Sequence, residues 1–388
     1  MHIQQTSSAA SPTAPRLRIA LFTDSYLPTR DGVVSSILNY QKGLAKGKHR
    51  FMVFAPNTGQ KGPEKDVFRF HSLPFLPYPE YRAALFPHVP VSVAKKTGVQ
   101  LVHSKGMMTM GVAAAWFARR AGLPSVASLE TMIPEGVHYV LPIKETHGFG
   151  KAIAWNYLKW LYSQFDLVTA PSKYAQEVMA ENGIESIVLP SPIDTERFRP
   201  NRHGDAVKRK LGLKGKKIVL SVGRVVKEKN YSLLLSAAKE MDDNTVFLIA
   251  GKGPYLNQLK REASSAGLSS RFLFAGFVPD DDLVGYYNAA DCFAFPSRFE
   301  TQGLTHLEAM ACGTPACVLD GTPMSEVVVD GRNGYVFTEN AEDCAEALSS
   351  CLANSKKMSA AARATALQHS IPKCTGKLLK IYRRLLEK

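Results

Sequence analysis

Two stretches of the chain decide the fold: residues 217–230 are KIVLSVGRVVKEKN, and residues 292–313 are CFAFPSRFETQGLTHLEAMACG. Each begins with a short apolar run that predicts a buried strand, and each continues through glycine and charged residues into a helical pattern. Strands that alternate with helices in this way are typical of parallel sheets. We therefore predict an α/β protein built on open parallel sheets.

Length and composition indicate two folded domains. The 388 residues exceed the usual size of one domain, and 45% of them are apolar and 21% charged, as in globular proteins. The formal net charge of +14 favours a polyanionic partner, which includes nucleic acid, an anionic membrane and a phosphate-bearing substrate. The six cysteines include no CxxC pair, so a reducing compartment fits best.

The alternation of strand and helix occurs twice. Predicted strands lie in the first half at residues 17–23, 51–55, 101–103, 125–129, 167–170 and 186–189, and in the second half at 217–222, 246–250, 272–274 and 292–295. The proline-rich residues 190–200 separate the two series. Ligands of open α/β sheets bind beyond the carboxyl ends of the strands. We therefore expect two doubly wound, Rossmann-like domains that face each other across a cleft.

The expected domain boundaries follow from this division. We predict a disordered leader at residues 1–16, an N-terminal Rossmann-like domain at 17–192 and a C-terminal Rossmann-like domain at 193–370. Residues 371–388 are expected to form a helix that crosses back to the N-terminal domain. The leader is polar and has no apolar stretch, which does not resemble a signal peptide.

The turn after the predicted strand 217–222 suits a diphosphate. Gly223 permits a tight turn, and the following helix start offers unpaired amides. Arg224 and Lys229 add two positive charges at the same place. A solvated basic loop with Asn230 as helix N-cap explains these residues equally well, so the turn alone does not decide a function.

The second stretch is predicted to open a helix near Gly303, and Glu308 is the unusual residue of that helix. It shares one helical face with Leu304 and Leu307, and a carboxylate on an apolar face is costly unless a partner donates hydrogen bonds to it. Ribose hydroxyls would be such a partner. The amides of Gly303 and Leu304 would then meet a diphosphate, and Glu300 would meet a sugar. The alternative is a salt bridge from Glu308 to a neighbouring helix.

Glu300 and Glu308, with seven residues between them, resemble the E-x7-E signature of the family 4 retaining glycosyltransferases, which have the GT-B fold. The resemblance extends over most of the chain. Residues 223–230 are similar to the GRxxxxKN phosphate loop of that family, and residues 319–337 are similar to its usual continuation. Residues 193–198 resemble its interdomain connector, and residues 26–33 its N-terminal glycine loop.

The resemblance implies a hexose transfer from a UDP- or GDP-linked sugar. It implies that residues 17–192 bind the acceptor and that residues 193–370 bind the nucleotide-sugar, and it implies roles for individual residues. Donor binding is implied for Gly32, Gly223, Arg224, Lys229, Gly303, Leu304 and Glu308. Catalytic roles are implied for Glu300, Arg224 and Lys229. Glu130 and His138 are two further candidates for a catalytic role. His103 lies at the end of a predicted strand, and it would either face the donor or acceptor or be structural.

The stretch 128–131 departs from the family pattern. Members with this kind of N-terminal domain commonly have a histidine there that contacts the donor sugar, whereas this chain has Glu130. Glu130 would have an altered role, or His138 would replace the histidine from a shifted loop. The identity of the general base stays open between these two.

Neither a metal nor another cofactor is expected. Residues 280–282 contain a D-x-D string, which holds a divalent metal in the other glycosyltransferase fold. Here the three aspartates open a predicted helix, where acidic side chains interact favourably with the helix dipole. Arg224 and Lys229 would instead stabilise the charge of the leaving diphosphate.

Two segments are candidates for contact with an anionic membrane. Residues 149–165 interleave aromatic and basic side chains, although a helix packed between domains would look much the same. Residues 75–96 are the second candidate, and both this segment and residues 300–304 resemble the corresponding segments of glycolipid-synthesising members of the family. This implies a lipid, lipid-linked or glycan acceptor and a cytoplasmic protein that is peripheral on the inner membrane face.

Other functions stay open at this point. The acceptor could instead be a soluble small molecule or a polysaccharide, and a less favoured alternative is a sugar-nucleotide epimerase of the same fold. Nothing in the sequence resembles a nucleic-acid-binding module, so no nucleic acid partner is expected.

Overall fold

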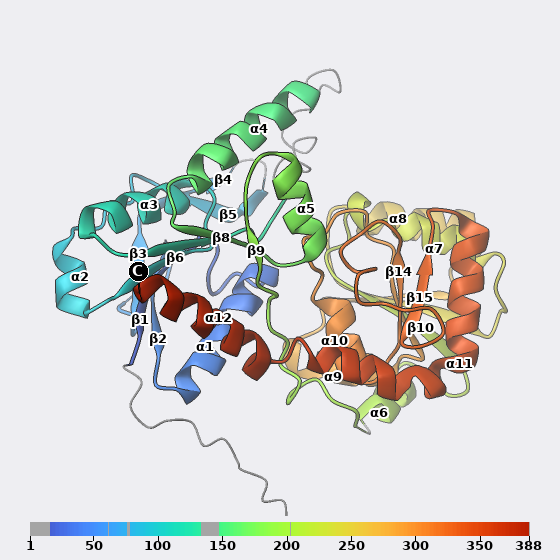
Figure 1. The fold of residues 1–388 in the computed structure, drawn as a ribbon. Coiled ribbons are helices and arrows are strands. Elements are labelled where there is room, and N and C mark those ends of the chain that lie inside the picture. Colours follow the sequence, from blue (N-terminus) through green and yellow to red (C-terminus); the bar gives the residue numbers. More distant parts are fainter. Residues whose placement is uncertain (1–15, 61, 76–77, 133–146, 202, 388) are drawn as a thin grey trace, which may run out of the picture.

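The computed structural model describes residues 16–60, 62–75, 78–132, 147–201 and 203–387, and it contains two parallel sheets that lie side by side (Figure 1). The predicted leader and His138 lie outside these residues. The N-terminal sheet has seven parallel strands, in the order β3 (Val67–Phe70), β2 (Arg50–Pro56), β1 (Arg18–Phe22), β6 (Leu101–Ser104), β7 (Ser125–Ser128), β8 (Leu167–Ala170) and β9 (Ile187–Val188).

The C-terminal sheet is also parallel throughout and has six strands. Their order is β12 (Phe272–Gly276), β11 (Thr245–Ala250), β10 (Lys217–Val222), β13 (Cys292–Phe295), β14 (Ala316–Leu319) and β15 (Gly334–Phe337). In each sheet the strand order reverses next to its first strand, between β1 and β6 and between β10 and β13. The crevices at these two reversals are where doubly wound sheets bind ligands.

All ten predicted strands are present. The sequence analysis missed β3, β14, β15 and the antiparallel hairpin of β4 (Ser72–Phe75) and β5 (Tyr78–Ala84). Most of these strands are only four residues long, and β3 and β15 lie at sheet edges. Their apolar runs are therefore too short for periodicity to indicate them.

Helices cover both faces of each sheet. The first half of the chain contains α1 (Gly32–Lys46), α2 (Ser92–Thr97), α3 (Thr109–Ala121), α4 (His147–Tyr162) and α5 (Lys173–Glu181). The second half contains α6 (His203–Lys210), α7 (Tyr231–Ala238), α8 (Leu256–Ser265), α9 (Asp280–Ala289), α10 (Thr305–Ala311) and α11 (Ala341–Leu367). Apolar side chains of the helices and strands form buried clusters on each side of each sheet. These clusters hold the helices against the sheets and thereby fix the positions of the strand ends.

The last helix, α12 (Ile371–Leu386), packs against α1 (Figure 1). The chain crosses between the domains next to residue 193, where Ile193 N donates to His369 O at 2.7 Å and Ile371 N donates back to Ile193 O at 3.2 Å. Buried Leu378 and Tyr382 of α12 belong to the same apolar cluster as β1 and α1. The C-terminus of the chain is therefore part of the core of the N-terminal half.

This packing predicts the effect of removing the Tyr382 ring. Tyr382→Ala is expected to destabilise the N-terminal half by about 3–5 kcal/mol, because the ring is fully buried and its loss leaves a cavity. All three tryptophans precede residue 193, so tryptophan fluorescence during urea unfolding follows this half alone. The control Lys380→Ala changes an exposed side chain of the same helix and should stay within about 0.5 kcal/mol of the wild type. An equal shift in both variants would contradict the packing.

Candidate active site

A cleft of about 1880 Å³ lies between the two domains. It is formed by the loops that follow β1, β6 and β7 on one side and β10, β11 and β13 on the other. They include the strand ends at the two switch points, those of β1, β6, β10 and β13. Of the predicted site residues, the cleft is lined by Gly32, Glu130, Gly223, Arg224, Lys229, Glu300, Gly303, Leu304 and Glu308.

The turn after β10 packs against the turn after β11 so closely that only glycine fits. A Cβ atom on Gly251 would lie 1.8 Å from the carbonyl oxygen of Gly223. Gly223 N donates a hydrogen bond to Ala250 O at 3.0 Å, which fixes the two turns to each other. Backbone rather than side chain therefore forms this part of the cleft wall, and Arg224 continues it. A wall of this kind lets a phosphate group approach the main chain.

Lys229 and Glu300 form an ion pair in the cleft. Their side chains are 18% and 16% exposed, so both are largely shielded from water. Ser297 Oγ donates to Glu300 Oε1 at 3.2 Å, and Lys229 Nζ lies 4.9 Å from the centroid of the Phe295 ring. The residue predicted to bind a diphosphate and the residue predicted to bind a sugar are thus direct neighbours.

Glu308 has the hydrogen-bond donor that the sequence analysis required. Tyr287 OH on α9 donates to Glu308 Oε2 at 2.7 Å. Burial raises the pKa of Glu308 to about 7, although the Tyr287 hydrogen bond and the positive charge of Arg197 act in the opposite direction. A carboxylate accepts up to about four hydrogen bonds, so Tyr287 leaves acceptor positions for a ligand in the cleft.

The helix that carries Glu308 begins at Thr305, two residues after the predicted start at Gly303. Gly303 has a φ of +74°, in the left-handed region that favours glycine. A Cβ atom there would also lie 2.9 Å from the Phe295 ring. Because of this left-handed turn the helix begins only at Thr305, and residues 300–303 form an irregular loop along the cleft.

The N-terminus of α1 faces this loop from the other domain. Asp31 caps the helix, since its Oδ1 accepts from Val34 N at 2.8 Å and its Oδ2 from Ser25 Oγ at 2.7 Å. A Cβ atom on Gly32 would lie 3.8 Å from Leu304 Cδ1, so the two domains approach closely here. The unpaired amides and the dipole of a 15-residue helix favour an anion at this end.

Two comparisons of the sequence bear on this geometry. Residues 30–197 match the family described as glycosyltransferase family 4, and residues 205–368 match the family described as glycosyl transferases group 1. The alpha-monoglucosyldiacylglycerol synthase of Streptococcus pneumoniae is 30% identical to this chain over 339 residues, which span 83% of this chain and 75% of that protein. The chain is a family 4 glycosyltransferase.

Other relatives and solved structures agree with this family and fold. The GDP-mannose-dependent alpha-mannosyltransferase of Mycolicibacterium smegmatis is 27% identical over 383 residues, which span 95% of this glycosyltransferase and 98% of that protein. The crystal structure of Anabaena Alr3699/HepE in complex with UDP superposes with a TM-score of 0.75 at 18% identity, covering 95% of this chain and all of that one. The fold is therefore GT-B, as the resemblance implied.

Two predicted histidines are not in the cleft that the structure describes. His103 is completely buried, with Nδ1 bonded to Tyr382 OH at 2.6 Å and Nε2 to Ser128 Oγ at 2.7 Å. Burial, assisted by the nearby charge of Lys105, holds the pKa of His103 well below its usual 6.5. In this glycosyltransferase His103 thus joins β6, β7 and α12 in the core, which agrees with the structural one of its two predicted roles and not with a substrate contact. His138 lies outside the described residues.

Lys105 is a cleft residue that the sequence analysis missed. It follows β6 and forms a buried ion pair with Glu130, which follows β7. Burial raises the pKa of Glu130, and Lys105 opposes this shift. A charged residue just beyond a predicted strand was the available signal, since Glu130 and Arg224 also lie just beyond their strands.

The groups that could ligate a metal lie apart from the donor residues. Among the described residues, the cluster that could hold an ion is formed by Cys292, Cys317 and Cys351, whose sulfur atoms lie within 4.8 Å of one another in the core of the C-terminal half. Asp280 of the D-x-D string instead pairs with Arg30 across the cleft. This aspartate therefore joins the two domains.

Proposed function

We propose that this glycosyltransferase moves a hexose from a UDP- or GDP-linked sugar to a lipid, lipid-linked or glycan acceptor at the cytoplasmic membrane face, with retention of configuration. One observation carries the donor part of the proposal. Arg224, Lys229, Glu300 and Glu308 line the same cleft wall, opposite the N-terminus of α1. Cations, helix amides and two carboxylates in this arrangement match the diphosphate, sugar and ribose of one extended ligand.

Relatives and structural neighbours support this class of donor. The relative from M. smegmatis is described as GDP-mannose-dependent, and Alr3699/HepE has been crystallised with UDP and with UDP-glucose. In the proposed complex, Arg224 and Lys229 contact the diphosphate, Glu308 accepts hydrogen bonds from the ribose, and Glu300 accepts them from the hexose. Gly32 lets the N-terminal domain approach the phosphates.

The proposed reaction places negative charge where the cleft has donors. The bond between the anomeric carbon and the diphosphate oxygen breaks, and its electron pair leaves with the diphosphate. The acceptor oxygen forms the new bond on the same face of the sugar, and its proton passes to the departing phosphate oxygen. Arg224, Lys229 and the α1 amides stabilise that charge without reorganisation, so no metal or other cofactor is required in this scheme.

Incubation with single donors tests the donor part of the proposal. The purified protein is mixed separately with UDP-glucose and GDP-mannose, and the slow release of UDP or GDP is measured without acceptor. We expect release from one of the two donors, and binding of the matching nucleotide by calorimetry. A protein that neither binds nor hydrolyses any nucleotide-sugar would contradict the proposal.

The lipid acceptor is supported by an apolar mouth of the cleft on the N-terminal side. Leu85, Phe86, Val112 and Trp116 line the cleft there, and Phe86 is 95% exposed. The exposed Ile153 and Trp160 lie on α4, which packs on α3 and projects from the domain (Figure 1). Exposed aromatic and aliphatic side chains of this kind are suited to lipid tails.

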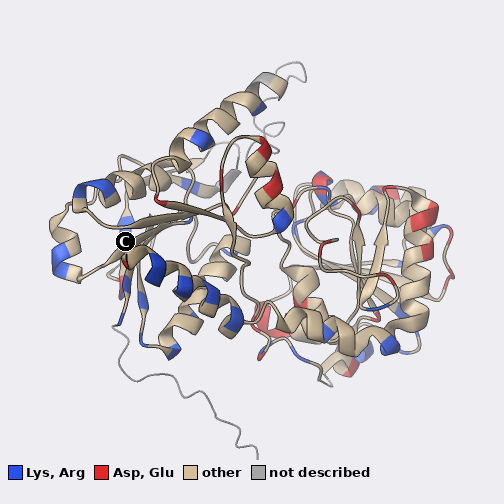
Figure 2. Cartoon of the chain, viewed as in Figure 1, with Lys and Arg blue, Asp and Glu red and all other residues tan. Residues whose placement is uncertain are grey.

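Basic side chains accompany this apolar surface. Helices α2, α3 and α4 carry lysine or arginine in their last turns, visible as blue bands in Figure 2. Attraction to an anionic bilayer would add to the apolar contact. Two relatives are described as alpha-monoglucosyldiacylglycerol synthases, which supports a diacylglycerol-based acceptor. No helix among the described residues is both long and apolar enough to cross a membrane.

The membrane contact makes a further prediction. Phe86→Ser is expected to reduce binding to phosphatidylglycerol vesicles about tenfold to a hundredfold, because inserting one phenylalanine contributes about 1.5–3 kcal/mol. Co-sedimentation at low and high salt measures this, and binding of both proteins should fall as salt rises. Val329→Ser changes a half-exposed side chain of the C-terminal half and should bind like the wild type. If the wild type does not bind these vesicles at low salt, a soluble or polysaccharide acceptor is favoured instead.

A further inference from the structure

The loop between β13 and α10 contacts both domains through successive residues. Glu300 pairs with Lys229 of its own domain, as described above. Thr301 Oγ1 donates to Glu130 O at 3.0 Å, and Thr301 O accepts from Ser172 Oγ at 2.7 Å, both in the N-terminal domain. The two residues that follow Glu300 thus point to the other domain. We call this loop, residues 296–304, the donor-binding loop. A movement of one domain relative to the other would therefore change its position.

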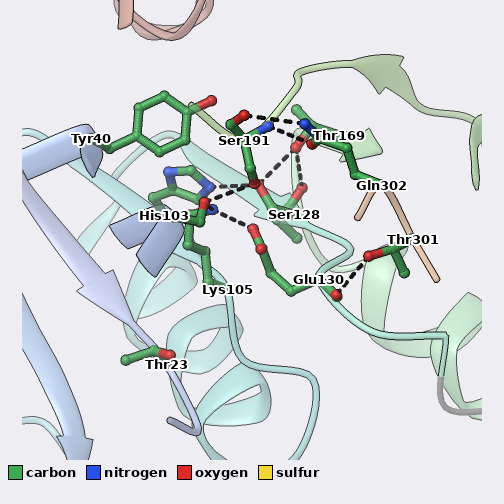
Figure 3. Close-up of polar contacts among 12 residues, drawn as sticks. Thr23, Tyr40, His103, Lys105, Ser128, Glu130, Thr169, Ser191, Thr301 and Gln302 are labelled. Atoms are coloured by element: carbon green, nitrogen blue, oxygen red, sulfur yellow. Dashed lines mark hydrogen bonds and ion pairs between the residues drawn. The ribbon is translucent and has the colours of Figure 1, made fainter. Parts of the chain in front are cut away.

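Gln302 makes the most complete of these contacts. Its Oε1 accepts from Ser191 N at 2.7 Å, and its Nε2 donates to Ser191 O at 3.2 Å. Both side chains are buried, with Gln302 6% exposed. Ser191 lies shortly after β9, in the segment that connects the two domains and that we call the crossing segment. The side-chain amide of Gln302 therefore bonds the donor-binding loop to this connection (Figure 3).

The remaining contacts close a ring. Ser191 Oγ and Ser36 Oγ are 2.8 Å apart, and Lys105 Nζ donates to Ser36 Oγ at 3.1 Å. Lys105 then pairs with Glu130, whose carbonyl accepts from Thr301, the residue next to Gln302 (Figure 3). We call this ring the polar lock, and it consists of Ser36, Lys105, Glu130, Ser191, Thr301 and Gln302.

Burial makes the polar lock sensitive to the loss of any one member. Lys105 is 3% exposed, and its ammonium lies 5.2 Å from the centroid of the Tyr40 ring. If Glu130 or Ser36 moved away, this charge would stay buried without its partners, which is costly. The contacts of Thr301 and Gln302 with the rest of the ring form in this arrangement of the two domains, and a movement of one domain away from the other would break them.

We propose that the polar lock holds the donor-binding loop in register with the N-terminal domain, and that Lys105 and Gln302 are positioning residues for sugar transfer. This inference rests on the proposed function. The nucleotide meets mainly the C-terminal domain in that proposal, whereas transfer needs Glu300 and the N-terminal wall together. Loss of the lock should thus affect the transfer rate and leave nucleotide affinity nearly unchanged.

Kinetics of Gln302→Leu and Lys105→Met test this separation. We expect kcat for sugar transfer to fall about tenfold or more in each variant, while the Kd for UDP or GDP stays within about twofold. Because both residues belong to one ring, the double variant should lose about as much as either single variant. Gln302→Glu keeps the acceptor for Ser191 N and should recover part of the loss. Lys42→Met is the matched control, since Lys42 pairs with Asp194 of the crossing segment but is 45% exposed and lies outside the ring.

A second measurement does not depend on activity. Spin labels on Lys96→Cys and Lys357→Cys report the distance between the domains, and the six native cysteines are buried. We expect one narrow distance distribution in the wild type and in Lys42→Met, and a broad one in Gln302→Leu. A narrow distribution or wild-type kcat in Gln302→Leu would overturn the inference. Failure of the wild type to bind any nucleotide-sugar would instead overturn the proposed function, and the distance measurement would still test the lock.

Discussion

Lys229→Met is expected to lower the rate of sugar transfer by about a hundredfold to a thousandfold, the usual cost of removing one preorganised donor from a developing negative charge. Methionine keeps the aliphatic length of the side chain, which packs near Phe295, but removes the ammonium. Loss of the charge also leaves Glu300 without its ion-pair partner inside the cleft. Initial rates with whichever of UDP-glucose and GDP-mannose the wild type uses measure the effect, and circular dichroism checks that the variant is folded.

Lys227→Met provides the matched control for this prediction. Lys227 belongs to the same 3-10 helix, Lys227–Lys229, but its side chain is exposed. The same change of charge at this position should leave the rate within about twofold, because a solvated charge contributes little to a buried site. If both variants lose activity equally, the effect comes from the general basic potential of the surface. If neither loses activity, Lys229 does not contact the diphosphate.

Nucleotide affinity is expected to rise with pH between about pH 6 and 8, because Glu308 has a pKa of about 7. Ribose hydroxyls donate hydrogen bonds, and an ionised carboxylate accepts them about twice as strongly as a neutral group. Binding should therefore weaken as pH falls through 7 and Glu308 becomes protonated. Calorimetric titration with UDP or GDP across this range measures the slope.

Glu308→Gln separates this carboxylate from other titrating groups. Glutamine keeps the hydrogen bond from Tyr287 but cannot ionise, so affinity should fall about tenfold at pH 8 and become nearly independent of pH. Ionisation of Glu308 has the opposite effect on the free energy of unfolding, which falls as nucleotide affinity rises. A carboxyl group whose pKa is raised by folding stabilises the folded state below its unfolded pKa of about 4.5, and this contribution is lost as pH rises through 7. A wild-type pH slope in Glu308→Gln would show that another group controls binding.

Much of the fold could be predicted because its signals are local. Buried parallel strands such as 217–222 and 246–250 are continuous apolar runs, and the turns after them contain glycine and charge. The family resemblance of residues 222–230 and 300–308 then identified the residues that line the cleft, although their roles stay predictions. The start of α10 was predicted two residues early, because the left-handed turn at Gly303 depends on its packing against Phe295.

Contacts between distant segments could not be predicted. His103 and Lys105 lie two residues apart at the end of β6, yet the structure places the first in the core and the second in the cleft wall. The difference depends on α12, which returns from the end of the chain and brings Tyr382 to His103. Nothing within the neighbouring sequence carries that information.

The sequence by itself determined the α/β class, the two series of strands and the charged turns at their ends, because periodicity and turn chemistry act over a few residues. Only the tertiary structure decided which of those turns meet. The ion pair of Lys229 with Glu300 and the bond of Gln302 to Ser191 join residues 71 and 111 positions apart. The first pair forms where the turns after β10 and β13 of the same sheet meet, and the second forms where the loops of the two domains are buried against each other. The free energy of both contacts depends on the arrangement of segments that are distant in the sequence.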